Sequence, residues 1–215
     1  FLAQWPESVG SAEYPLVAES VKSSHMGYFF RGRREDPVAD ASEARFITPS
    51  HGEEDGVKSD TDFYLHPAMR AEEVAADVLK AIEADTSRLI CCNIAAPDMV
   101  GHLLPNRYRE ATTAYSKAAD AIVKMASAAR SNGWSFIITA DHGNIENDTS
   151  AHSVNDILTT IIAGDDSTFD PTIPIYQARL FDIAPTILTL IGANRIPSQS
   201  TQSERFRGRP LVHMG

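Results

Sequence analysis

The chain has 215 residues, of which 43% are hydrophobic and 22% are charged, a composition typical of globular proteins that excludes disorder throughout. Its formal net charge of −10 argues against non-specific binding to nucleic acid or to an anionic membrane, but it allows a small anionic substrate in a locally cationic site. We find no apolar run that could span a membrane and no signal peptide, and we expect a cytoplasmic protein whose two adjacent cysteines, Cys91 and Cys92, are reduced core thiols.

The first half of the chain is predicted to contain two strands and one helix. Residues 26–30 (MGYFF) are short and aromatic-rich, which predicts a strand, and polar, turn-rich sequence follows over 31–62 with a surface loop at 50–60. Apolar side chains at helical spacing predict a helix over 67–84. The apolar run 88–94 (RLICCNI) predicts a buried strand, and a loop follows over 95–106.

The second half repeats this alternation of helices and strands. A long helix is predicted over 109–132, ended by Gly133, and apolar runs at 135–139 and 158–163 predict two further buried strands. A last helix is predicted over 182–191, with Asp182 as its N-cap and Gly192 at its end. The alternation indicates an α/β fold with a mostly parallel sheet covered by helices on both faces.

Aspartates and histidines gather where two of these strands end. The run 96–102 (APDMVGH) follows one strand, the run 140–144 (ADHGN) follows another, and residues 151–153 (AHS) come shortly afterwards. Ligands of parallel α/β folds bind at the carboxyl ends of strands, and carboxylate with imidazole suits a divalent ion such as Mn²⁺ or Zn²⁺. One Asp-His pair alone is more often a cap or a turn, but three such elements predict a metal site.

The neighbours of these motifs carry further expectations. Asp141 and His142 are adjacent, so we expect their side chains to diverge and to serve two different ions, or one ion and the surroundings of another. Gly101 and Gly143 are expected to let the backbone turn sharply beside the ions. Three other histidines lack such a context and are predicted to be surface residues: His51, His66 and His213.

Taken together, the three motifs resemble the metal-binding signature of the cofactor-independent phosphoglycerate mutases of the alkaline phosphatase superfamily. The segments 18–36 and 181–192 (FDIAPTILTLIG) also resemble segments of that family, so the resemblance extends over about 18–192. It implies an alkaline phosphatase-like fold and two divalent ions, usually Mn, with Zn, Mg or Co as alternatives. It assigns one ion to Asp98, His102 and His152, the other to Asp141 and His142, and the reacting phosphoryl group to Lys22.

The resemblance also implies what the chain lacks. In the family a metal-bound serine takes the phosphoryl group of phosphoglycerate and returns it to the other hydroxyl, which interconverts 3-phosphoglycerate and 2-phosphoglycerate. We do not find that serine, the aspartate of its metal site or the inserted arginine-rich domain that holds the glycerate. We therefore expect residues 1–215 to be the C-terminal part of the phosphatase domain of a monomeric glycolytic enzyme, inactive by themselves.

Two alternatives stay open at this stage. One is a phosphatase or phosphonate hydrolase of the same superfamily, which the arginine-rich domain would distinguish from a mutase. The other is a non-catalytic metal-binding fragment. The sequence departs from the family pattern at Gly32 and Arg33, in the acidic stretch 51–60 and in the short segment after Asn144, and these departures concern the substrate more than the metal.

Overall fold

A three-stranded parallel sheet lies at the centre of the molecule. The computed structural model describes residues 14–29, 33, 43–51, 62–164, 167–169, 178–192 and 208–214. Strands β1 (Tyr14–Glu19), β2 (Glu43–Thr48) and β3 (Cys91–Asn93) form the sheet in the order β2-β1-β3. The middle strand, β1, is buried at all six positions. The predicted α/β fold with a parallel sheet and helices is thus confirmed.

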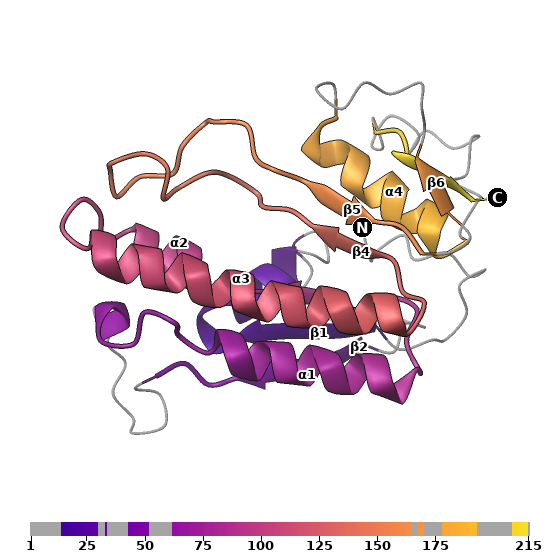
Figure 1. The fold of residues 1–215 in the computed structure, drawn as a ribbon, viewed down its shortest axis with the longest axis horizontal. Coiled ribbons are helices and arrows are strands. Elements are labelled where there is room, and N and C mark those ends of the chain that lie inside the picture. The colour runs from indigo at the N-terminus through magenta and orange to yellow at the C-terminus, as the bar shows by residue number, and fades with distance from the viewer. Residues whose placement is uncertain are drawn as a thin grey trace.

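Two helices cover one face of this sheet. Helices α1 (Ala71–Ala84) and α3 (Tyr108–Ser131) pack against each other in front of the strands (Figure 1). Their buried residues recur at spacings of three and four, and they share a hydrophobic cluster with Val17 of β1. Both predicted helices therefore exist, although α1 begins four residues later than 67.

A short helical segment covers the opposite face. Tyr14, Leu16 and Ala18 alternate with Val17 along β1, so they face the other side of the sheet and pack against Met26. Met26 belongs to η4 (His25–Phe29), a π-helix that follows the 3₁₀ turn η3 (Ser20–Lys22). The strand predicted at 26–30 is therefore wrong, because contacts with the sheet override the strand preference of its aromatic residues.

The remaining strands pair antiparallel outside the central sheet. Strand β4 (Phe136–Ile138) pairs with β5 (Thr160–Ile162), and β6 (Ser167–Phe169) pairs with β7 (Val212–Met214) beside helix α4 (Ile183–Leu190). Asp182, in η7 (Leu180–Asp182), makes no side-chain cap bond to α4. Its carboxylate instead accepts the backbone N–H groups of Arg179 and Arg209. Thr186 of α4 accepts the N–H of Leu211, and these bonds hold the segment before β7 beside the helix.

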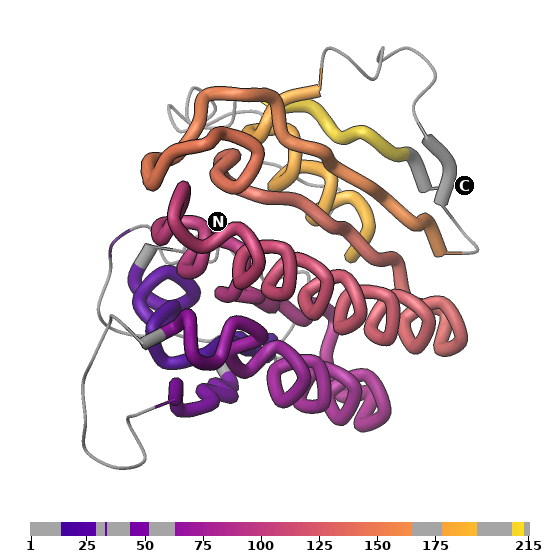
Figure 2. The backbone as a smooth tube through the Cα atoms, turned by 60° about the vertical axis from the view of Figure 1, so that its left-hand side comes forward, coloured from indigo at the N-terminus to yellow at the C-terminus, as the bar shows by residue number. Residues whose placement is uncertain are grey.

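Two features of the fold position the site. The predicted loop 95–106 contains a short helix, α2 (Ala96–Gly101), which packs on α3 at the carboxyl end of β3. The segment between β4 and β5 extends to that same end of the molecule (Figure 2). The described part of the chain contains no helix long and apolar enough to cross a membrane.

The cysteines and the predicted surface histidines behave largely as expected. Cys91 and Cys92 in β3 are free thiols, and although both residues retain some exposed surface, burial of the thiol groups raises the pKa of each to about 12. His51 and His66 are exposed and stack with their ring centroids 4.3 Å apart. The side chain of His213 and most of the 50–60 loop lie outside the described residues.

Candidate metal centre

Two of the predicted ligands project from the same face of α2. Asp98 and His102 are four residues apart, which places their side chains one above the other on a helix. Ala96, Val100 and Gly101 form the buried face of α2, so the aspartate and the histidine remain partly exposed. His152 reaches the pair from the segment between β4 and β5.

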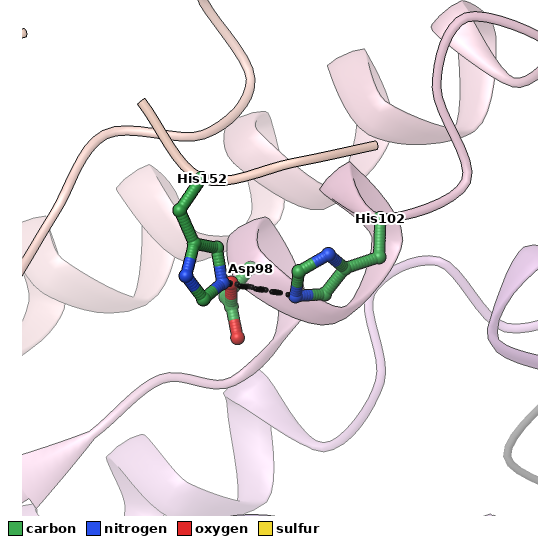
Figure 3. Close-up of side chains that lie close together, drawn as sticks. All are labelled: Asp98, His102 and His152. Carbon is green, nitrogen blue, oxygen red and sulfur yellow. Dashed lines mark hydrogen bonds and ion pairs between the residues drawn. The ribbon is translucent and has the colours of Figure 1, made fainter. Parts of the chain in front are cut away.

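The three side chains converge on one point (Figure 3). Asp98 Oδ1 lies 3.3 Å from Nε2 of His102 and 3.3 Å from Nε2 of His152, and the two Nε2 atoms are 3.1 Å apart. Among the described residues, this is the one group of three or more potential metal-ligating side chains whose donor atoms all lie within 4.8 Å of one another. The predicted convergence of Asp98, His102 and His152 is therefore observed.

A backbone contact sets the protonation of one imidazole. Nδ1 of His102 lies 2.7 Å from the carbonyl oxygen of Ser150, and because a carbonyl only accepts, Nδ1 must donate. In neutral His102 the lone pair is therefore on Nε2, the atom that faces Asp98 and His152. Metal-binding histidines commonly donate their second ring N–H in this way.

Asp98 is held as a carboxylate by two donors. Lys22 Nζ lies 2.6 Å from its Oδ2, and Asn144 Nδ2 donates to its Oδ1 at 2.8 Å. Burial alone raises the pKa of Asp98, but the hydrogen bonds from Lys22 and Asn144 and the nearby positive charges outweigh it, so the pKa lies below its usual range. The site thus presents an ionised oxygen.

Asn144 belongs to the centre although sequence reasoning gave it no role. It is buried, and its amide also donates to the backbone carbonyl of Asp98 at 3.2 Å. A Cβ atom on Gly101 would lie 2.7 Å from Asn144 Oδ1. Gly101 does not have the positive φ found at Gly133 and Gly192, so its role is to leave space for the amide rather than to make the predicted sharp turn.

The second predicted pair is placed beside the first site. Asp141 and His142 follow β4, and His142 stacks on His152 with ring centroids 3.6 Å apart. Their side chains do not diverge as predicted, because His142 Nε2 lies 3.5 Å from Asp141 Oδ1. No third donor joins this pair within the described ranges, so the pair would need further ligands to hold an ion.

The donor set of Asp98, His102 and His152 fits a divalent ion of borderline hardness. Two imidazole nitrogens and one carboxylate oxygen suit Zn²⁺, Mn²⁺ and similar ions, and three protein ligands leave coordination positions for water or substrate. The facing Nε2 lone pair of His102 and the carboxylate repel each other unless a proton or a cation lies between them. Three donors among the described residues are the number that catalytic zinc sites use, whereas closed structural sites use four.

Comparison with known proteins places the chain among metalloenzymes. A family model described as the metalloenzyme superfamily matches residues 13–195. The 2,3-bisphosphoglycerate-independent phosphoglycerate mutase of Thermomicrobium roseum is 32% identical over 219 residues, covering 98% of this chain and 38% of that protein. The enzyme of the same name from Brugia malayi is 29% identical over 218 residues, covering 99% and 39%. This chain thus spans a little over a third of the length of these relatives.

A solved structure shares the fold. The crystal structure of Leishmania mexicana phosphoglycerate mutase at low cobalt concentration superposes with a TM-score of 0.76 at 17% identity, covering 95% of this chain and 37% of that chain. At this identity the match establishes the architecture alone.

Proposed function

We propose that this chain, which belongs to the metalloenzyme superfamily, is the metal-binding part of a 2,3-bisphosphoglycerate-independent phosphoglycerate mutase. The observation that carries the proposal is the convergence of Asp98, His102 and His152 in a chain that matches such mutases over 92% or more of its length. We also assign residues 1–215 to the C-terminal part of an alkaline phosphatase-like domain.

The ion we assign to this site is Mn²⁺, with Zn²⁺, Mg²⁺ or Co²⁺ as substitutes. One carboxylate oxygen and two imidazoles are acceptable to Mn²⁺, whereas Mg²⁺ prefers oxygen ligands. When bound, such an ion polarises a phosphoryl oxygen and lowers the pKa of a coordinated hydroxyl. We assign Asp141 and His142 to a second ion, whose remaining ligands would come from the rest of the parent protein.

Lys22 is the catalytic residue we assign to this chain. Its ammonium lies 2.6 Å from Asp98 Oδ2, and its side chain is 13% exposed, so it is fixed at the rim of the ligand cluster. From there it would neutralise charge on the equatorial oxygens of a phosphoryl group that reaches the site. Two groups would orient the ligands: the Ser150 carbonyl through its bond to His102, and Asn144 through its bond to Asp98.

Steps beyond metal and phosphoryl binding are assigned to other parts of the parent enzyme. Transfer between the two hydroxyls needs a covalent carrier for the phosphoryl group and cationic groups that hold the glycerate while it turns. The parent protein is accordingly proposed to be a monomeric, cytoplasmic enzyme of glycolysis that takes phosphoglycerate. By the same reasoning the chain alone lacks mutase activity.

The decisive test uses the intact native protein that contains this chain. It should convert 3-phosphoglycerate into 2-phosphoglycerate, lose that activity in EDTA and regain it when Mn²⁺ is restored. Release of inorganic phosphate without 2-phosphoglycerate would identify a phosphatase instead, and activity unaffected by EDTA would contradict the metal assignment.

A second assay tests the division of labour. The 215-residue chain, loaded with Mn²⁺, should form no 2-phosphoglycerate, because loss of a nucleophile costs on the order of 10⁶ in rate in well-studied hydrolases. Slow phosphate release is compatible with the proposal, since bound hydroxide can attack in line. Formation of 2-phosphoglycerate at an ordinary enzymatic rate would overturn the view that the chain is an incomplete half.

A further inference from the structure

A carboxylate outside the ligand set closes the segment that carries His152. Glu146 Oε2 accepts the backbone N–H of Asn144 at 2.9 Å. Its other oxygen, Oε1, accepts the hydroxyl of Ser153 in a short hydrogen bond and the side-chain amide of Asn155 at 3.3 Å. One side chain thus bonds to both ends of the segment 144–155, and we call this arrangement the Glu146 clamp.

The clamp acts on the residue next to a proposed ligand. Ser153 follows His152 directly, is only 7% exposed, and donates its backbone N–H to the carbonyl oxygen of Gly143 at 2.8 Å. This bridge brings His152 beside His142, and their rings stack. The position of the His152 ring therefore depends on where Ser153 is held.

The Glu146 clamp packs so closely against Gly143 that no side chain would fit there. A Cβ atom built on Gly143 would overlap both Glu146 Oε1 and Ser153 Oγ, so the carboxylate and the hydroxyl lie directly against the glycine backbone. The structural alternative is that Glu146 merely solvates a surface turn. That alternative does not require a carboxylate shared by groups seven and nine residues further along the chain.

We propose that Glu146 is a positioning residue for the metal site, holding His152 through Ser153 in the orientation that lets its Nε2 face Asp98 and His102. The proposal rests on the assignment of these three residues as metal ligands. Glu146 does not contact the ion, so its removal weakens metal binding only through His152. Groups that orient a metal-binding histidine typically contribute 10–100-fold to affinity.

The experiment is a double-mutant cycle on Mn²⁺ affinity. Free Mn²⁺ is measured by electron paramagnetic resonance in titrations of the wild-type chain, Glu146→Ala, His152→Ala and the double variant. We expect Glu146→Ala to raise the dissociation constant at least tenfold in the wild-type background and less than twofold in the His152→Ala background. A merely structural role would lower affinity equally in both backgrounds, and that outcome would overturn the proposal.

Matched variants protect the interpretation. Asp148→Ala removes the same charge from the same segment at an exposed position and should leave the affinity unchanged. Glu146→Gln retains one acceptor oxygen and should fall between Glu146→Ala and the wild type. Ser153→Ala should reproduce the loss without changing any charge, and it replaces Glu146→Ala in the cycle if circular dichroism finds that variant unfolded.

The outcomes separate this proposal from the one beneath it. If the wild-type chain binds no Mn²⁺, or if His152→Ala binds as well as the wild type, the ligand assignment fails. If His152→Ala weakens binding while Glu146→Ala and Ser153→Ala bind like the wild type, the ligands stand and the clamp proposal alone is refuted.

Discussion

Replacing Asp98 by asparagine tests the centre of the site with a change of a single atom. The carboxylate is shared by Lys22, Asn144 and the two histidines. Its lowered pKa means that the folded state favours the charged form, so removing the charge must cost stability even without metal. Asparagine keeps the size of the side chain but offers Lys22 only a neutral oxygen.

The magnitude follows from the strength of the bonds lost. Hydrogen bonds to charged groups contribute about 1.5–3 kcal/mol each, and the ion pair with Lys22 is mostly shielded from water, with side chains 13% and 20% exposed. Asparagine can keep neutral hydrogen bonds of about 1 kcal/mol each to Lys22 and Asn144, so we expect a net loss of about 2 kcal/mol in EDTA. For a chain of this size each kcal/mol corresponds to roughly 2–4 °C in Tm, so the Tm should fall by about 4–8 °C.

Metal then separates the variant further from the wild type. At a Mn²⁺ concentration of about 100 Kd, binding stabilises the native state by about 2.7 kcal/mol, and a hundredfold weaker site would gain only about 0.4 kcal/mol. Calorimetry in EDTA and in Mn²⁺ measures both effects. Asp120→Asn is the control, because its 3.6 Å pair with Lys117 is exposed and contributes at most about 1 kcal/mol. Equal Mn²⁺ stabilisation of Asp98→Asn and the wild type would refute the ligand assignment.

Three further predictions concern the core and the surroundings of the site. Val78→Ala should lower the free energy of unfolding in urea by about 2 kcal/mol because Val78 is 3% exposed, whereas Val123→Ala, at 64% exposed, should change it by less than about 0.5 kcal/mol. Burial raises the pKa of Glu19 above 4.5, so the protonated side chain stabilises the fold below that pH and this stability is lost as the pH rises. The stability of Glu19→Gln relative to the wild type should therefore increase from pH 4 to pH 7, measured by urea midpoints. Gly101→Ala should push Asn144 away from the site, destabilising the fold by about 1–3 kcal/mol and weakening Mn²⁺ binding measured by calorimetry.

The long helices could be predicted from sequence because their own period carries the information. α1 and α3 bury residues at every third or fourth position, a pattern that survives whatever surrounds them. The strands are harder, because β1 and β2 owe their state to the sheet. β1 contains a proline and ends in a buried glutamate, Glu19, whose carboxylate accepts the backbone N–H of Arg70, the N-cap residue of α1. A contact between residues 51 positions apart cannot be predicted from the local sequence pattern of either segment.

The proposed ligands could be predicted from the sequence, whereas the residues that hold them in place could not. Asp98, His102 and His152 are residue types that commonly bind metals. The motif of the first two lies at the end of β3, and that of His152 lies in the segment between β4 and β5. Glu146 and Ser153 are ordinary polar residues whose role appears only when the chain closes on itself. The sequence shows the spacing of the proposed ligands, but the hydrogen bonds that orient them join residues whose contacts appear only in the folded structure.

The proposed metal site joins two segments that are distant in the chain, so metal binding should be coupled to their fold. Asp98 lies in α2 and His102 is the C-cap residue of that helix, which packs against α3, so two of the three proposed ligands are held by one helix. His152 belongs to an exposed segment whose approach to α2 depends on His102, Ser150 and the Glu146 clamp. Because the proposed ligands come from α2 and its C-cap on one side and from the segment 144–155 on the other, an ion that binds all three side chains would also stabilise the closed segment. Metal affinity and the local stability of residues 144–155 should therefore rise and fall together.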